Sequence, residues 1–179
     1  MIGRMMFAFA TAGLFALGAC ADTTRLSSAP TPAPTPAAPF GETVAWSVGP
    51  CFGFCPVYKV EVDAKGTVTF DGERHTAVLG RKVREGGPVA YRAIADALAT
   101  YRPTTGATVQ TTCEQQISDS SSYVLTWTRP DGTVTTLRHD RGCRSTRNDG
   151  LNSALQALPQ RLGIAGWAAQ TTRAGVSRG

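Results

Sequence analysis

The chain has little of what enzyme active sites are usually built from. Among its 179 residues there are only two histidines, His75 and His139. The serines that end at Ser122 follow Asp119, but they lack the glycine-flanked turn that exposes a nucleophile. Gly86-Gly87-Pro88 has neither the lysine nor the spacing of a phosphate-binding loop. These shortages predict no catalytic site and favour a non-catalytic binding or structural role.

An apolar run long enough to cross a membrane is also missing at the start of the chain. The run from Met5 to Leu17 carries no charge, but it is shorter than the roughly 20 residues that span a bilayer. It follows Arg4 and ends in Leu17-Gly18-Ala19-Cys20, the pattern of a lipobox, so residues 1–19 are predicted to be a lipoprotein signal peptide. Ordinary secretion, with cleavage at a small-residue site around the same cysteine, is the alternative.

A lipid on Cys20 would make the membrane the first partner of the protein. Each buried acyl methylene contributes about 0.8 kcal/mol, so two or three chains anchor a protein firmly where one is marginal. Ala21 follows Cys20 at the position where aspartate often signals retention in the inner membrane. We therefore expect a cell-envelope protein, anchored in the outer membrane and facing the periplasm.

Composition divides the rest of the chain into three parts. Residues 20–41 contain the lipidated cysteine and a linker rich in proline, alanine and threonine, which cannot form a core and favours polyproline II. Residues 42–167 are predicted to form a single α+β domain, and residues 168–179 a flexible C-terminal tail. The net charge of +5 suits an anionic envelope surface, whereas an anchored envelope protein is not expected to bind nucleic acid.

Apolar and polar residues alternate in several short segments, as they do in strands with one buried face. The segment from Tyr58 to Asp63 is the clearest, and a turn at Gly66 returns the chain into a second strand. Asp71-Gly72 is predicted to turn the chain again. These patterns predict strands and hairpins over residues 44–48, 58–70 and 123–137.

Two segments have the apolar spacing of helices that bury one face. The first starts at Gly86-Gly87-Pro88, and its predicted apolar stripe runs from Val89 to Tyr101. The second is predicted to start with Asp149 as its cap and to bury leucines up to Leu158. The predicted fold class is α+β: a small antiparallel sheet built from hairpins, with two helices on one face, stapled by disulfides.

Four of the five cysteines remain once Cys20 is assigned to lipid. An even number in an exported chain predicts two disulfides, with three connectivities open. Cys113 and Cys143 flank the second predicted hairpin, whose antiparallel strands bring its ends together. We therefore predict the pairs Cys51–Cys55 and Cys113–Cys143.

The densest motif is Cys51-Phe52-Gly53-Phe54-Cys55-Pro56-Val57-Tyr58. Two cysteines at this spacing can bind Cu(I) or cycle between dithiol and disulfide. The spacing is similar to that of the copper-delivering thioredoxin-fold proteins that help assemble cytochrome oxidase, in which a helix follows and a distant histidine completes the site. Here a strand pattern follows Pro56, so a structural disulfide loop is favoured. A thiol redox or copper-handling protein using Cys51, Cys55 and His139 is the alternative function.

At this motif the chain resembles an uncharacterised family of bacterial exported proteins and lipoproteins, a domain of unknown function. The resemblance covers most of residues 45–167. It implies a small α+β domain, and it implies no known activity, substrate or cofactor. The residues that carry it are Cys51-Phe52-Gly53-x-Cys55-Pro56-x-Tyr58, Gly66-x-Val68, Asp119, Tyr123, Gly142-Cys143 and a terminal helix that ends near Trp167.

Basic residues gather in the sequence around Cys143. Arginine forks match carboxylate and phosphate groups, so this segment is a candidate for gripping lipid headgroups, cell-wall polymer or an acidic protein. A solvated loop is the alternative. No cofactor or metal is expected, copper being part of the alternative function only. The candidate anion-binding residues are Arg138, Arg141, Arg144 and Arg147.

Overall fold

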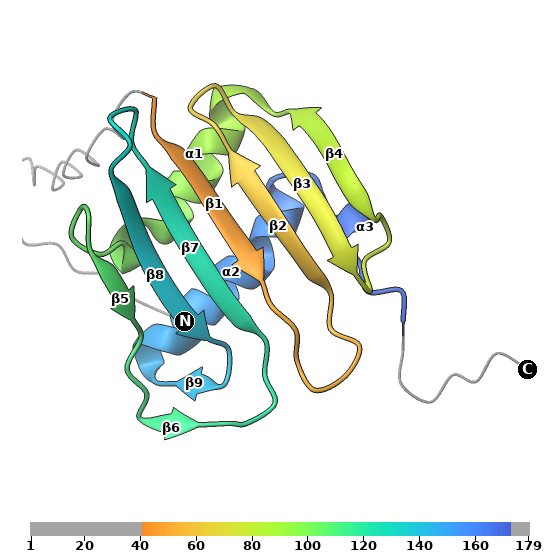
Figure 1. Ribbon diagram of the computed structural model, residues 1–179, viewed down its shortest axis with the longest axis vertical. Coiled ribbons are helices and arrows are strands. Elements are labelled where there is room, and N and C mark those ends of the chain that lie inside the picture. Colours follow the sequence, from red (N-terminus) through yellow and green to blue (C-terminus); the bar gives the residue numbers. More distant parts are fainter. Residues whose placement is uncertain (1–40, 173–179) are drawn as a thin grey trace, which may run out of the picture. The chain divides into compact units, whose positions relative to one another are not determined.

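Strands hold more residues than helices do in the part of the chain that the computed structural model describes, residues 41–172 (Figure 1). Seven of them form one sheet in the order β4-β3-β2-β1-β7-β8-β5. Two short strands form a separate ladder. The predicted signal peptide, the lipid site at Cys20, the linker and most of the predicted tail lie outside the described residues, so these stay predictions. The strands are β1 (Thr43–Val48), β2 (Val57–Val62), β3 (Thr67–Arg74), β4 (Gly80–Glu85), β5 (Thr108–Gln110), β6 (Gln115–Gln116), β7 (Ser122–Thr128), β8 (Val134–Asp140) and β9 (Cys143–Arg144).

All neighbouring strands of the large sheet run antiparallel except one pair. β1 lies in the middle, between β2 of the first hairpin and β7 of the second. β5 pairs with β8 in parallel, with Val109 opposite Leu137. The α+β class is therefore confirmed, with the difference that the sheet is mixed rather than purely antiparallel.

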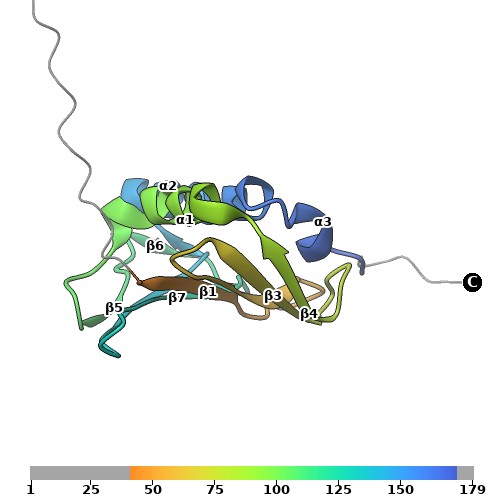
Figure 2. The same ribbon diagram turned by 90° about the horizontal axis from the view of Figure 1, so that it is seen from above.

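Helices cover only one face of this sheet, as Figure 2 shows. The larger ones are α1 (Gly87–Leu98) and α2 (Thr146–Arg161); a 3-10 turn, η1 (Ala99–Tyr101), follows α1, and the short α3 (Ala165–Ala168) follows α2. No helix among residues 41–172 is both long enough and apolar enough to cross a membrane.

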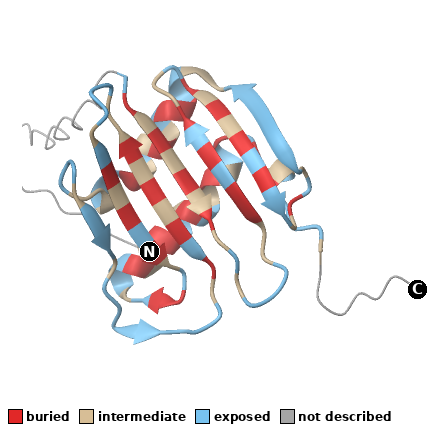
Figure 3. Ribbon diagram, in the orientation of Figure 1, coloured by how far each residue is buried: buried red, intermediate tan, exposed pale blue. Residues whose placement is uncertain are grey.

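The core lies between the sheet and the helices. In β1, β2, β3, β7 and β8 buried residues alternate with more exposed ones, which gives the bands of Figure 3, whereas β4 and β5 are exposed throughout. Val44, Trp46 and Val48 of β1 point to the helices, whereas Ala45 and Ser47 face the uncovered side. Burial of such apolar side chains contributes roughly 1.5–3 kcal/mol each. The helices supply Ile94 and Leu98 of α1 and Leu151, Leu155 and Leu158 of α2.

Three local predictions were wrong. Asp71-Gly72 is not a turn but lies within β3. Val89 is exposed, because α1 turns the neighbouring row of Ala90, Ile94 and Leu98 toward the sheet. Ser145 rather than Asp149 caps α2, since its side chain accepts a hydrogen bond from the Asn148 N–H at 3.2 Å.

Candidate functional site

Residues 51–58, Asp119, Tyr123 and Gly142-Cys143 gather at one end of the sheet, the lower end in Figure 1, which we call the motif end. Gly66-x-Val68 lies at the opposite end, at the turn between β2 and β3. At the motif end β1 and β8 finish, and β2 and β7 start. The strand register places Val48 opposite both Tyr58 and Tyr123, and Tyr123 opposite His139. These four buried side chains form a row across the sheet that faces the helices.

The loop between β1 and β2 is closed by the disulfide Cys51–Cys55, whose Cα atoms are 5.7 Å apart. Gly53 has φ = +143°, a backbone conformation that favours glycine. The Phe52 N–H donates to the Asp119 carbonyl at 3.2 Å, which ties this loop to the segment before β7. The disulfide and this hydrogen bond therefore both restrain the conformation of the loop.

The two aromatic residues of this loop face solvent to different degrees. Phe52 is 88% exposed, whereas Phe54 is 41% exposed. The Phe54 ring meets the His75 ring edge to face, with centroids 5.4 Å apart. Phe52 thus stands out as a large apolar side chain that the fold presents to its surroundings.

A cavity of about 420 Å³ opens beside the loop, and we call it the motif-end cavity. Tyr58, Ser121 and Tyr123 line it from the sheet side and are each more than nine-tenths buried. Arg141 lines it as an exposed side chain. The other lining residues are Val48, Cys55, Pro56, Leu155, Gln156, Pro159, Gln160, Ala165, Ala168, Ala169 and Gln170.

The two tyrosines of the motif-end cavity are neutral hydrogen-bonding groups. Burial raises the pKa of Tyr58 to about 12, and the nearby Tyr123 hydroxyl adds to that rise. Burial also raises the pKa of Tyr123, while the positive charge of Arg141 works in the opposite direction. The side chains of Tyr58, Tyr123 and Arg141 all line the motif-end cavity.

The second disulfide joins Cys113 to Cys143, so the pairing predicted from the sequence is the one that the structure contains. Gly142 precedes Cys143 and passes so close to the chain that an added Cβ would lie 2.0 Å from the Ile117 carbonyl oxygen. Only glycine allows this approach, which explains why the motif has a glycine at position 142, directly before Cys143.

His139 is buried in a network beside this second disulfide. Its Nε2 donates to Asn152 Oδ1 at 3.1 Å, and its Nδ1 accepts from Thr111 Oγ1 at 2.9 Å. The Tyr123 ring stacks on its ring at 6.2 Å. Desolvation lowers the pKa of His139. Both ring nitrogens are thus engaged, an arrangement that does not support His139 as a copper ligand for the Cys51 and Cys55 pair.

The structure separates the four candidate arginines. Arg138 is exposed on the uncovered face of the sheet, since Leu137 and His139 on either side point to the helices. Arg144 forms an ion pair with Asp149. Arg147 stacks over Tyr101, with 5.4 Å from its Cζ to the ring centroid. Arg141 alone of the four lines the motif-end cavity.

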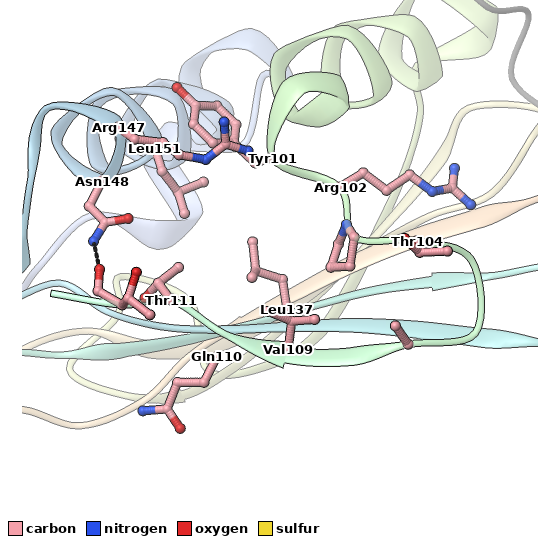
Figure 4. Close-up of a pocket in the computed structure, with 13 residues that line it drawn as sticks. Tyr101, Arg102, Thr104, Val109, Gln110, Thr111, Leu137, Arg147, Asn148 and Leu151 are labelled. Carbon is pink, nitrogen blue, oxygen red and sulfur yellow. Dashed lines mark hydrogen bonds between the residues drawn. The ribbon is translucent and has the colours of Figure 1, made fainter.

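A second cavity, of about 500 Å³, lies between β5, the end of η1 and the start of α2 (Figure 4). Its floor is apolar, with Val109, Leu137 and Leu151. Two of its polar side chains donate to backbone carbonyls: Asn148 Nδ2 to that of Thr112 at 2.9 Å, and Arg147 to that of Thr100. No sequence motif pointed to this cavity.

Within residues 41–172, no group of three or more His, Cys, Asp or Glu side chains is placed to hold a metal ion. The fold and the motif end define a small α+β domain with two disulfides and a polar cavity. Residues 42–162 match the family described as Domain of unknown function (DUF6438), and the chain belongs to that family. Comparison with curated proteins and with solved structures finds no match. Membership of an uncharacterised domain family, which the motif predicted, is thereby confirmed.

Proposed function

We propose that this protein is a lipid-anchored, non-catalytic binding module of the bacterial cell envelope. A lipid on Cys20 holds it at the outer membrane, facing the periplasm. The lipobox pattern that ends at Cys20 supports the anchor, and the two disulfides support an exported location, because such bonds persist in oxidising compartments.

The proposed binding surface is the motif end, and the observation that carries it is Phe52, 88% exposed on a loop that a disulfide closes. A free loop could fold its phenylalanine back onto the protein, and burial of that side chain would contribute roughly 1.5–3 kcal/mol. The Cys51–Cys55 bridge opposes this collapse. The loop is therefore already ordered before a partner binds, and binding loses less conformational entropy than it would with a flexible loop.

The position of the motif end suits an anchored protein. β1 carries the chain from Thr43, which follows the linker, to Val48 beside the loop (Figure 1). The loop therefore lies at the end of β1 opposite to the one where the chain enters the sheet. A partner in the periplasm can reach it while the lipid stays in the membrane.

Site-specific photo-crosslinking in living cells tests this proposal. A photoreactive phenylalanine analogue replaces Phe52 in one strain and Val89 in a matched control strain; Val89 is 67% exposed and lies at the start of α1, beside the turn at the opposite end of the sheet. We expect a discrete crosslinked product from position 52 and none from position 89. Identical patterns from both positions would contradict the motif end as the binding surface.

The anchor has its own test. The intact mass of the mature N-terminus should show Cys20 carrying a diacylglycerol group and an acyl chain. Cys20→Ala should release the domain from the membrane fraction or block its maturation. An unmodified mature chain that begins beyond Cys20 would refute the lipid anchor while leaving the binding surface open to the crosslinking test.

A further inference from the structure

We propose that the motif-end cavity binds a carboxylate group, with Arg141 as the cationic partner and the hydroxyls of Tyr123 and Ser121 as neutral hydrogen-bonding partners. This inference rests on the proposed function, because it gives a ligand chemistry to the same end of the sheet. Of the four arginines that the sequence offered as anion-binding candidates, it selects Arg141.

The first support is polar side chains that lack partners. Ser121 is 4% exposed and Tyr123 6%, yet among the hydrogen bonds within residues 41–172 neither hydroxyl has a protein partner. The guanidinium of Arg141 likewise forms no ion pair with a described residue. None of these three groups is among the buried side-chain atoms without a partner in residues 41–172, so their polar atoms open into the cavity, where a ligand or water can bind them.

The second support is the charge of the cavity. Arg141 is its only charged lining residue, and its lining contains no aspartate or glutamate. One guanidinium matches the single negative charge of a carboxylate in a bidentate geometry. A phosphate monoester carries about −1.5 to −2 at neutral pH, and part of that charge would stay uncompensated in a partly dry site.

The contrast with the other arginines supports the same choice. Arg144 already has a carboxylate partner in Asp149, and Arg147 is engaged by Tyr101 and the Thr100 carbonyl. Arg138 stands on the open face of the sheet and does not line the motif-end cavity. Of the four arginines, Arg141 alone lines the motif-end cavity, and it has no ion-pair partner among the described residues.

The walls of the cavity indicate what surrounds the carboxylate. Leu155, Ala165 and Ala168 offer a shallow apolar side, and Gln156 and Gln160 offer amides. A small group with both apolar and hydrogen-bonding atoms fits this lining. A peptide C-terminus with small side chains and a sugar acid both have this chemistry, and the experiment distinguishes them.

Calorimetric titration of the full-length protein in a neutral detergent tests the proposal. The probes are N-acetyl-alanyl-alanine, its C-terminal amide, D-glucuronate and inorganic phosphate. We expect one of the two carboxylates to bind, and the one that binds identifies the source. The amide and phosphate should bind at least about tenfold more weakly. Absence of binding by both carboxylates, or equal binding of the amide, would overturn the proposal.

Three variants assign the site. Arg141→Gln should weaken carboxylate binding about tenfold or more, because a charge-assisted pair is lost. Tyr123→Phe keeps the ring stacked on His139 and removes only the hydroxyl, and it should weaken binding about threefold. Arg138→Gln is the matched control and should bind like the unmodified protein. Equal binding by all three variants, each with an unchanged unfolding midpoint, would overturn the assignment.

The outcomes keep the two proposals apart. A crosslink at position 52 together with no carboxylate binding leaves the proposed function standing and removes the carboxylate site. Carboxylate binding that depends on Arg141, with no crosslink at position 52, keeps the site and removes the loop as a partner surface.

Discussion

The two disulfides of this domain close loops of very different size in very different surroundings. Cys51 and Cys55 are separated by 4 positions and bracket the exposed Phe52. Cys113 and Cys143 are separated by 30 positions, and Cys143 is buried against the side chains of Thr111 and Asn148. The short bridge shapes what the surface displays, whereas the long bridge joins β9 and the segment before β6 to the packed interior.

The largest expected effect is the loss of the long bridge. Replacing both Cys113 and Cys143 by serine should lower the free energy of unfolding by about 3.7 kcal/mol, because a loop of about 31 residues is released in the unfolded chain. The same change at Cys51 and Cys55 should cost only about 2 kcal/mol. Urea unfolding of both double variants measures the difference. Equal losses would contradict the contrast between the two bridges.

The network around His139 should show the next largest effect. Asn152→Ala removes the acceptor of His139 Nε2 and the donor to the Arg141 carbonyl, and leaves the buried His139 nitrogen without a partner. We expect a loss of about 1–3 kcal/mol in the free energy of unfolding. Gln156→Ala, one turn later on the exposed side of α2, is the control and should change it by less than about 0.5 kcal/mol. A similar loss in both variants would show that the network adds nothing specific.

The free energy of unfolding should also depend on pH through His139, which lies beside the long bridge. The pKa of His139 is lower in the folded state than in the unfolded chain, so the unfolded state binds more protons. Stability should therefore be constant above the ordinary histidine pKa of about 6.5 and fall as the pH drops below it. Urea midpoints between pH 8 and 5 measure this slope. His139→Gln should flatten it, and an unchanged slope would assign the effect to other groups.

The smallest effect is expected at Phe52, in the loop that the short bridge closes. Phe52→Ser should change the free energy of unfolding by less than about 0.5 kcal/mol, because the side chain is already in water. A larger loss would mean that Phe52 stabilises the fold, which would remove the reason to regard it as a partner anchor. The same urea measurement with the disulfides intact decides this.

Local patterns in the sequence predicted which segments form strands and helices better than they predicted the role of single residues within them. Gly72 shows why: a Cβ there would lie 2.0 Å from the Val78 carbonyl, so glycine serves a close crossing of the chain within a strand and not a turn. Val89 shows the same difficulty in α1, since two adjacent apolar rows both fit a helical stripe. Only packing against the sheet decided that Ala90, Ile94 and Leu98 are the buried row.

The arginines show the limit of adjacency in sequence. Arg138, Arg141, Arg144 and Arg147 lie within ten residues, yet a strand, a turn, a short ladder and a helix carry them to different surfaces. Side chains in a strand alternate between faces, so Arg138 had to point away from His139. The sequence predicted one anion-binding group of four arginines, whereas in the structure only Arg141 of the four lines the motif-end cavity.

By itself the sequence determined the α+β class, the two helices and the pairing of the cysteines, because alternation, helical spacing and turn residues act over short distances along the chain. Only the tertiary structure decided that Tyr58, Tyr123 and Arg141 share one cavity. Their meeting depends on the register of β2, β1, β7 and β8, and on the helices that cover one face. That register comes from pairing between distant segments, for which no local pattern is sufficient.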